Sequence, residues 1–307
     1  MSERGERTID MVSRERRYRV VHRTTYRYEL PMTDGYTVAH LLPRDTPRQR
    51  VAESVVNVMP EPSERDEHVD AFGNRVTQFG MHHPHDELVV EAVSTVHVDG
   101  PMPIDDAESW NDVAARVDRL RGDEAIDVGP FRARTRFVDI NRVGAELAAI
   151  AYASFTPGRG ITEAAADLCH QIYDEFKYDS TATDVSSPLA DVLASRRGVC
   201  QDFAHLAAGC LRSIGLAARY VSGYIETAPP AGRDRLVGAD ASHAWCSIWT
   251  PSAGWIDFDP TNDHFPTRRH VTVAWGRDYA DVTPVRGVVI GPSRAQTLDV
   301  AVDVVLV

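Results

Sequence analysis

Residues 196–216 read RRGVCQDFAHLAAGCLRSIGL, and the interpretation of the fold starts from this stretch. Apolar residues recur in it at spacings of three and four, from Phe203 to Ile214. That period is typical of a helix with one buried stripe. Gly198 interrupts any preceding helix and lets the backbone turn. The sequence therefore predicts a helix whose first turn carries Cys200.

Cys200 has the position expected of a nucleophile. A thiol at the start of a helix lies near unpaired backbone N–H groups and the positive end of the helix dipole. Both favour the thiolate, which is the form that attacks carbon. The same N–H groups are suited to stabilise an oxyanion. The competing interpretation is a small core residue, which is the commoner role of a cysteine in an apolar helix.

Two downstream segments supply a base and a carboxylate. In DASHAWCSIW (240–249), His243 begins the period-two alternation of a strand. In GWIDFDPTND (254–263), Asp257 and Asp259 share one face of a second strand. The short connection predicts a hairpin that places His243 opposite Asp259 or one diagonal step away. Asp259 is preferred to Asp257 as the group that orients the imidazole, because Asp257 lies two residues nearer the turn.

These segments resemble the catalytic core of the transglutaminase-like superfamily, and more narrowly its bacterial cysteine-peptidase-like branch. The matching motifs are GVCQDFAH (198–205), ARYVSGY (218–224), SHAWCSIW (242–249) and GWIDFDPTN (254–262). Residues 18–51 are similar to that branch's N-terminal β region, and 273–288 to its C-terminal signature. The resemblance implies that Cys200 is the nucleophile, His243 the general base and acid, and Asp259 the orienting carboxylate.

Further residues near the motifs have separate interpretations. Trp245 and Gln201 are the candidates for substrate contact, although a large aromatic on a half-buried strand more often packs in the core. Asp202 is expected to complement the helix dipole. His205 lies about 140° round the helix from Cys200 and is interpreted as a structural hydrogen-bonding group. The charged 276–282 segment either pins the C-terminal tail to the core or shapes the cleft.

A metal site is a competing interpretation of the same residues. A zinc set can be assembled on paper from Cys200, His205, Cys210, His243 and Cys246. The first three do not share one helix face, and Cys246 points away from His243 on its strand. Neither a CxxC pair nor an HExxH motif occurs. We therefore expect no metal and no cofactor.

Bulk composition limits the classes of partner. A chain of 307 residues is long enough for about two domains. The net charge of −12 argues against nucleic acid. No apolar run reaches about 18 residues and no signal segment is visible, so we expect no membrane partner. Four cysteines, three of them in or beside the core motifs, fit reduced thiols in the cytoplasm. The oligomeric state is not indicated.

The predicted fold class is α+β, with a papain/transglutaminase-like core in which the cysteine helix packs on an antiparallel sheet. We expect a disordered tail at 1–16, an N-terminal antiparallel β domain at 17–100 and a helical connection at 101–150. The catalytic core follows at 151–265, and a C-terminal strand segment at 266–307. Within the β domain, DAFGN (70–74) predicts a hairpin turn.

The expected chemistry is acyl transfer at an amide or peptide bond of a peptide or protein substrate, through a thioester on Cys200. Hydrolysis is favoured, because water is always available as the acceptor. Transamidation of protein glutamine is the first alternative. Self-crosslinking is disfavoured, because Lys177 is the only lysine. A non-catalytic scaffold on the same fold is the second alternative, which loss of a triad member would favour; none is lost.

Overall fold

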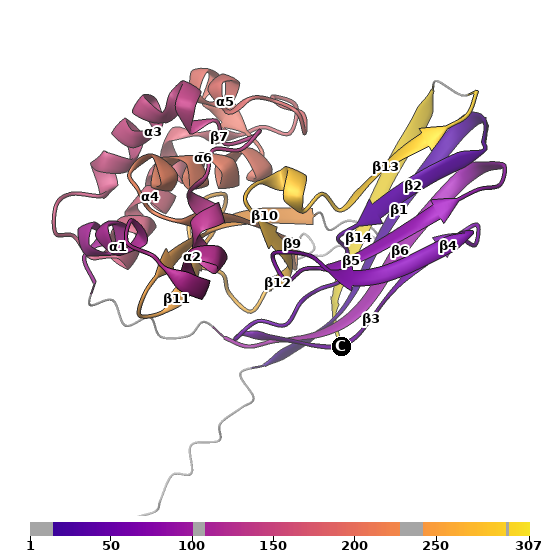
Figure 1. Ribbon diagram of the computed structural model, residues 1–307, viewed down its shortest axis with the longest axis horizontal. Coiled ribbons are helices and arrows are strands. Elements are labelled where there is room, and N and C mark those ends of the chain that lie inside the picture. Colours follow the sequence, from indigo (N-terminus) through magenta and orange to yellow (C-terminus); the bar gives the residue numbers. More distant parts are fainter. Residues whose placement is uncertain (1–14, 101–107, 228–241, 293–294) are drawn as a thin grey trace, which may run out of the picture.

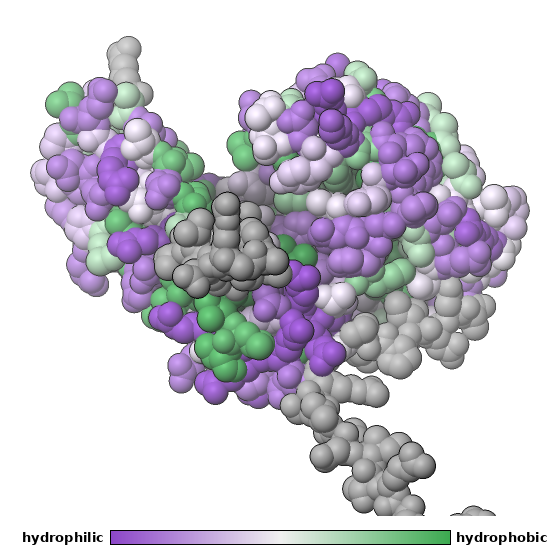
Figure 2. Space-filling model, turned by 180° about the vertical axis from the view of Figure 1, so that it is seen from behind, coloured by the Kyte–Doolittle hydropathy of each residue, from purple (hydrophilic) through white to green (hydrophobic). Residues whose placement is uncertain are grey.

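The computed structural model describes residues 15–100, 108–227, 242–292 and 295–307. They form a β-sandwich beside a helical lobe that is built on a third sheet (Figure 1). Seen from behind, the surface is largely hydrophilic and is hollowed between the two lobes (Figure 2). The predicted tail at 1–16 lies almost wholly outside the described residues. Among the described helices, none is long and apolar enough to cross a membrane.

The sandwich consists of two antiparallel four-stranded sheets. In order across the first sheet, the strands are β14 (Gln296–Leu306), β1 (Arg16–Met32), β6 (His85–Val98) and β3 (Gln49–Met59). The second sheet contains β13 (Val285–Ile290), β2 (Asp34–Ala39), β5 (Arg75–Met81) and β4 (Glu64–Val69). Buried residues from both sheets, including Val58, Phe79 and Leu88, form the core between them. The last two strands of the chain therefore complete the sheets begun by its first strands.

The predicted turn at 70–74 is confirmed as the connection between β4 and β5. The Asp70 carboxylate accepts the backbone N–H groups of Phe72 and Asn74, both at 2.8 Å. Gly73 has a φ of +77°, a conformation that glycine adopts without steric cost. The residue types at this turn thus explain its geometry.

The helical lobe is built on an antiparallel sheet that we call the core sheet. Its strand order is β11 (Gly254–Phe258), β10 (Ser242–Thr250), β9 (Ala218–Ile225) and β12 (His270–Gly276). The helices are α1 (Trp110–Val117), α2 (Gly122–Val128), α3 (Ile140–Ser154), α4 (Ile161–Glu175), α5 (Leu189–Ser195) and α6 (Cys200–Ser213), with short 3₁₀ turns η1 (Gly129–Arg132) and η2 (Tyr279–Asp281). Two short strands, β7 (Lys177–Tyr178) and β8 (Arg197–Gly198), pair in parallel.

The central helix α6 differs from the sequence prediction of one buried stripe. Every residue from Gln201 to Arg212 is buried. One side of α6 packs on β9 and β10, and α3, α4 and α5 cover other parts of its surface. A helix enclosed in this way has no solvent-facing side, so its polar residues must find partners within the protein.

Two amide side chains of the sandwich lobe hold the edge strand of the core sheet. Gln49 donates from Nε2 to the Thr272 carbonyl at 2.6 Å, and its Oε1 accepts the Thr272 N–H at 2.8 Å. Asn74 makes the same pair of bonds to the backbone of Trp275, at 2.8 and 2.9 Å. An edge strand has unpaired backbone groups, and here the other lobe satisfies four of them.

Apolar packing reinforces this contact between the lobes. A buried cluster combines Tyr18, Val302 and Val304 of the first sandwich sheet with Tyr224 and Val271 of the core sheet. Cys200 packs against the same cluster. The start of α6 therefore lies beside the junction of the lobes.

The position of β14 predicts unequal effects of substitution at two neighbouring valines. Val304 is fully buried and Val305 is 40% exposed. We expect Val304→Asp to lower the free energy of unfolding by about 3 kcal/mol or more, because it buries an unpaired charge. Val305→Asp is the matched control and should change it by less than about 0.5 kcal/mol. Urea denaturation measures both, and equal effects would contradict the packing of β14.

Candidate active site

Cys200 is the first residue of α6, as the sequence predicts, and it is half-buried. The preceding turn is held by Asp202, whose carboxylate accepts the Val199 N–H at 2.8 Å and the Thr183 hydroxyl at 2.6 Å. A Cβ atom on Gly198 would lie 2.7 Å from that carboxylate, so the turn requires glycine there. Asp202 thus caps the helix that carries the thiol, at its first turn as expected.

His243 is the second residue of β10, and its imidazole reaches the Asp259 carboxylate. The register pairs Cys246 with Phe258 and Ser247 with Asp257, which places His243 one diagonal step from Asp259. His243 Nε2 lies 2.7 Å from Asp259 Oδ2. Asp257, the rival considered from the sequence, lies beside Ser247 instead. The predicted hairpin therefore brings the predicted imidazole and carboxylate into contact.

Asp259 is fully buried and lies at the centre of a hydrogen-bond network. Its Oδ2 accepts from His243, from His270 Nε2 at 3.1 Å and from Asn262 Nδ2 at 2.7 Å. Its Oδ1 accepts the Thr261 N–H at 3.0 Å. Burial alone would raise the pKa of Asp259, but the hydrogen bonds from His243 and His270 hold that pKa well below its usual range. The carboxylate therefore stays ionised at neutral pH.

Asp259 and Cys200 both act on the imidazole of His243. Burial would lower the pKa of His243, but hydrogen bonds to Asp259 and Cys200 and the negative charges of both groups raise it to about 10. Because Nε2 is bonded to Asp259, Nδ1 is the ring nitrogen left for the Cys200 sulfur. The imidazole thus carries a proton at neutral pH that it can deliver to a leaving group.

The two predicted substrate-contact residues are enclosed. Trp245 is fully buried, with its ring centroid 6.0 Å from that of His243 and 5.4 Å from that of His270. Gln201 is 8% exposed and donates to the Val185 carbonyl at 3.3 Å. Trp245 therefore packs behind the two histidines rather than on an open wall of a cleft, and substrate contact by either residue stays a prediction.

His205 has the structural role expected from the sequence. Its Nε2 accepts the Tyr279 N–H at 3.1 Å, and its ring stacks on Phe137 with centroids 5.3 Å apart. Burial lowers the pKa of His205 to about 3, so the ring is neutral. In the 276–282 segment, Asp278 accepts the Phe137 N–H at 3.1 Å. Of the two alternatives for this segment, these contacts support the one in which it is pinned to the core.

His270 is the member of the Asp259 hydrogen-bond network that sequence reasoning missed. It begins β12, eleven residues after Asp259, and the irregular stretch between them gives no period from which the contact follows. The available signal was the alternation HVTVAWG (270–276), which marks a strand that starts at a histidine. Burial lowers the pKa of His270, so it is a neutral donor to Asp259.

The ligand atoms of His243, Asp259 and His270 lie within 4.8 Å of one another, so these three groups could together hold a metal ion. This set differs from the cysteine-containing set weighed from the sequence. Its nitrogen–oxygen distances of 2.7 and 3.1 Å are those of ordinary hydrogen bonds. Protons shared between the rings and the carboxylate therefore account for the arrangement.

Comparisons with known proteins identify the family. The model of the bacterial transglutaminase-like N-terminal region matches residues 18–97, and that of the transglutaminase-like superfamily matches residues 150–260. An uncharacterized protein of Mycobacterium tuberculosis is 41% identical over 300 residues, covering 94% of this chain and 92% of its own length. Another uncharacterized protein, from Mycobacterium leprae, is 35% identical over 291 residues, which cover 94% of this chain and 98% of that protein. The chain belongs to the transglutaminase-like superfamily.

A solved structure shows the same fold. It is that of a protein from Cytophaga hutchinsonii, described provisionally as a cysteine protease, with a TM-score of 0.73 and 22% identity over 94% of this chain and 91% of that chain. A 75-residue segment is also 40% identical to a protein-glutamine gamma-glutamyltransferase of Pseudomonas aeruginosa, covering 24% of this chain and 11% of that protein. The predicted fold class is confirmed, and the family supports cysteine-dependent acyl transfer as the general chemistry.

The four thiols differ in accessibility, which predicts selective alkylation. Cys200 is half-buried, whereas burial raises the pKa of Cys169, Cys210 and Cys246. We expect Cys200 to react with iodoacetamide at pH 7 at least about tenfold faster than the others, because only thiolates alkylate. Mass spectrometry of digested protein measures this. Cys200→Ala should remove the fast phase, and equal slow labelling of all four thiols would contradict the geometry.

The raised pKa of His243 predicts how stability depends on pH. A folded-state pKa of about 10 against 6.5 means that folding favours the protonated ring. The stabilisation is fully present below about pH 6.5 and is lost as pH rises towards 10. Relative to His243→Gln, the free energy of unfolding of the wild type should fall by up to about 1.4 kcal/mol per pH unit in that window.

Urea denaturation at pH 6.5, 8 and 10 tests this pH dependence. Working above pH 5 keeps Asp259 ionised throughout, because its pKa is lowered. A difference between wild type and His243→Gln that stays constant across the window would show that the ring is not held in its protonated form.

Proposed function

We propose that this protein is a cysteine-dependent hydrolase of amide or peptide bonds, with Cys200, His243 and Asp259 as its catalytic triad. One observation carries the proposal: a buried imidazole is bonded to a buried carboxylate at 2.7 Å, and the Cys200 side chain contributes to the raised pKa of that imidazole. The three groups come from different parts of the chain: α6, β10 and the residue that follows β11. Such an arrangement suits nucleophilic catalysis at a carbonyl.

Each step of the reaction has a group placed for it. The Cys200 sulfur attacks the amide carbonyl, and the carbon–nitrogen bond breaks as His243 gives its proton to the departing amine. A thioester remains on the sulfur. Water then adds to the thioester carbon while His243 takes a proton from it, and the carboxylic acid leaves as the sulfur is released. Backbone N–H groups in the first turn of α6 are suited to the transient oxyanion.

Asp259 is the positioning group in this proposal. Its bond to Nε2 fixes the ring orientation and leaves Nδ1 for the sulfur. Further donors, His270 and Asn262, stabilise the charge of the carboxylate, which therefore does not take the proton from His243. The histidine alone exchanges protons with the substrate, as general acid–base catalysis requires.

The proposed substrate is a peptide or protein, and the proposed compartment is the cytoplasm. The four cysteines are free thiols, which suits a reducing environment. A net charge of −12 disfavours nucleic acid as a partner.

Transamidation is the second candidate, and the 75-residue similarity to a protein-glutamine gamma-glutamyltransferase favours it. Both reactions pass through the same thioester on Cys200 and differ only in whether water or an amine attacks it. The choice therefore depends on the acceptor, which an assay can supply or withhold.

A peptide library, incubated with and without an added primary amine and read by mass spectrometry, tests the proposal. We expect new carboxyl ends in both conditions, at a rate that Cys200→Ala lowers by at least about 1000-fold. Cys210→Ala removes a thiol from the same helix and should retain activity. Amine adducts would instead identify transamidation. No product above the Cys200→Ala background, together with slow labelling of Cys200, would favour a non-catalytic scaffold.

A further inference from the structure

A cavity of about 1400 Å³ lies between the loops of the sandwich and the core sheet. Its described lining comes from residues 46–48 and 71–73, from α2 and η1, from β9, β11 and β12, and from residues 252–253, 265–266 and 277 beside these strands. Small-molecule sites are commonly about 300–1000 Å³, so the volume is ample for a ligand. Among the described lining residues there is no member of the triad.

Two side chains that line this cavity, Arg219 and Asp257, and a third between them in the sheet, Ser247, have unsatisfied polar atoms. Ser247 of β10 pairs with Asp257 of β11 on one side and with Arg219 of β9 on the other, so the three form a row across the sheet. Asp257 Oδ1, Ser247 Oγ and Arg219 Nε are all buried and, among the described residues, have no hydrogen-bond partner. Buried polar atoms are normally paired, so such a row indicates a site for an external group.

Arg219 is the most constrained member of the row. It is 6% exposed, and its guanidinium lies 4.5 Å from the Trp255 ring and 3.6 Å from the Trp275 ring. Burial lowers the pKa of Arg219 to about 9, and the charge of Asp257 opposes that shift. The guanidinium is therefore cationic at neutral pH and packs against two aromatic rings. Among the described residues, it donates no hydrogen bond to a carboxylate or a carbonyl.

The other charged groups of the lining are engaged elsewhere or lie on α2. Arg277 pairs with Asp281 at 2.8 Å, and Arg48 donates to the carbonyls of Gly100 and Asp99 at 3.2 and 3.4 Å. Asp127 comes from α2. Asp257 acts electrostatically on Arg48 as well as on Arg219, and within the row itself Arg219 and Asp257 are one cation and one anion.

The walls of the cavity are largely aromatic. Phe72 and Phe131 lie with ring centroids 5.5 Å apart, and Phe131 and Trp255 with centroids 5.0 Å apart. Phe265 and Trp275 add to the same lining. This surface suits apolar substituents around the polar row.

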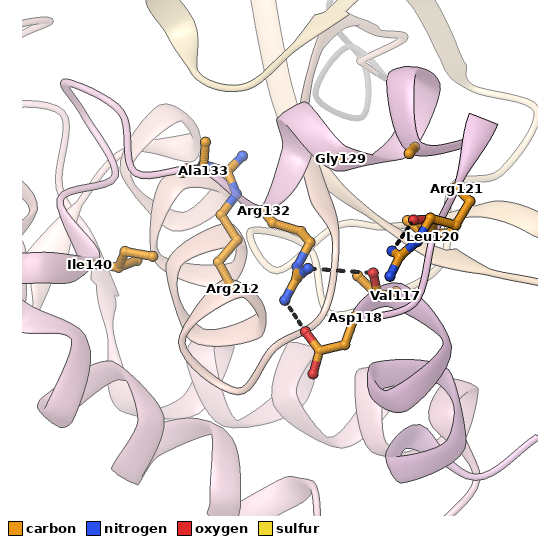
Figure 3. A pocket seen from close by; sticks show the side chains of 10 residues that line it. Val117, Asp118, Leu120, Arg121, Gly129, Arg132, Ala133, Ile140 and Arg212 are labelled. Atoms are coloured by element: carbon orange, nitrogen blue, oxygen red, sulfur yellow. Dashed lines mark hydrogen bonds and ion pairs between the residues drawn. The ribbon is translucent and has the colours of Figure 1, made fainter. Parts of the chain in front are cut away.

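A smaller cavity of about 520 Å³ gives an instructive contrast (Figure 3). Its arginines have partners: Arg132 bonds to the Asp118 carboxylate and donates to the Val117 carbonyl at 3.4 Å. Arg212 donates to the carbonyls of Ala133, at 3.2 Å, and Ala218, at 2.7 Å. Those polar groups need no ligand, whereas the row in the larger cavity does.

We propose that the larger cavity binds an uncharged amide with apolar substituents, whose carbonyl accepts from Arg219 and whose N–H donates to Asp257. The row offers one unpaired donor and one unpaired acceptor with a hydroxyl between them, and an amide presents the complementary acceptor and donor on one small group. A net-neutral ligand matches a pair of opposite charges. Small amides and peptide segments share this chemistry.

Calorimetric titration with three related ligands tests the hydrogen-bonding requirement. 3-Phenylpropanamide carries both the acceptor and the donor, its methyl ester analogue lacks the donor, and 3-phenylpropanoate carries a negative charge. We expect the amide to bind at least about tenfold more tightly than the ester or the acid, because either substitute leaves Asp257 unpaired. A capped leucine–phenylalanine dipeptide distinguishes the two kinds of ligand. If it binds more tightly than the small amide, the natural ligand is a peptide segment; if it binds more weakly, the natural ligand is a small amide.

Paired variants distinguish a loss of ligand binding at this cavity from a loss of folding. Arg219→Met with Asp257→Leu replaces both charges by apolar side chains of similar size, and should weaken amide binding at least about tenfold without lowering the melting temperature. The exposed pair Arg116→Gln with Glu124→Gln is the control and should bind normally. If the double variant does not fold, Ile126→Arg at the exposed rim on α2 should still weaken binding.

Titrations repeated in the Cys200→Ala background keep the ligand intact and make binding independent of turnover. Equal affinity in that background is expected, so a failure of the proposed reaction would leave this result unchanged. Equal binding of the amide, ester and acid, or normal amide binding by both cavity variants, would overturn the proposal.

Discussion

The buried carboxylate of Asp259 is the constraint on which the candidate site depends. A charge without solvent contact is strongly destabilising unless hydrogen bonds replace its lost hydration. Here His243, His270 and Asn262 bond to one oxygen and the Thr261 N–H to the other. These donors keep the group ionised, and an ionised carboxylate in turn keeps His243 protonated and oriented. The proton available to the Cys200 site is therefore set by a residue that has no surface exposure.

The sandwich lobe contributes to this network although it supplies none of the three proposed catalytic residues. His270 begins β12, the edge strand of the core sheet. Gln49 and Asn74 of the sandwich lobe each make two hydrogen bonds to the backbone of that strand. Side-chain amides that pair with backbone groups fix both the position and the register of an edge strand. A chain of direct contacts thus runs from the sandwich through β12 and His270 to Asp259, which explains why the two lobes form one structural unit.

The parts of the site that could be predicted are those encoded by local periodicity. A helical period placed Cys200 at the start of α6, and a strand period with a short turn placed His243 one diagonal step from Asp259. His270 could not be predicted in this way, because its contact crosses an irregular segment after Asp259. The burial of α6 on all sides was also missed, since helices from other parts of the chain cover it. Strand character near the C-terminus was evident, but the pairing of β14 with β1 spans nearly the whole chain.

The core sheet separates two kinds of polar group along one strand. Alternation places His243, Trp245 and Ser247 on the same face of β10, so His243 and the unsatisfied row lie four residues, or about 14 Å, apart. Trp245 lies between them and is fully buried, with its ring against His243 and His270. Near His243, every hydrogen-bonding atom of Asp259 is used, whereas beyond Trp245 three atoms are left unpaired. One strand thus supports a preorganised network at one end and an open set of donors and acceptors at the other. The Trp245 indole lies between these two environments, and its own Nε1 is buried without a hydrogen-bond partner among the described residues.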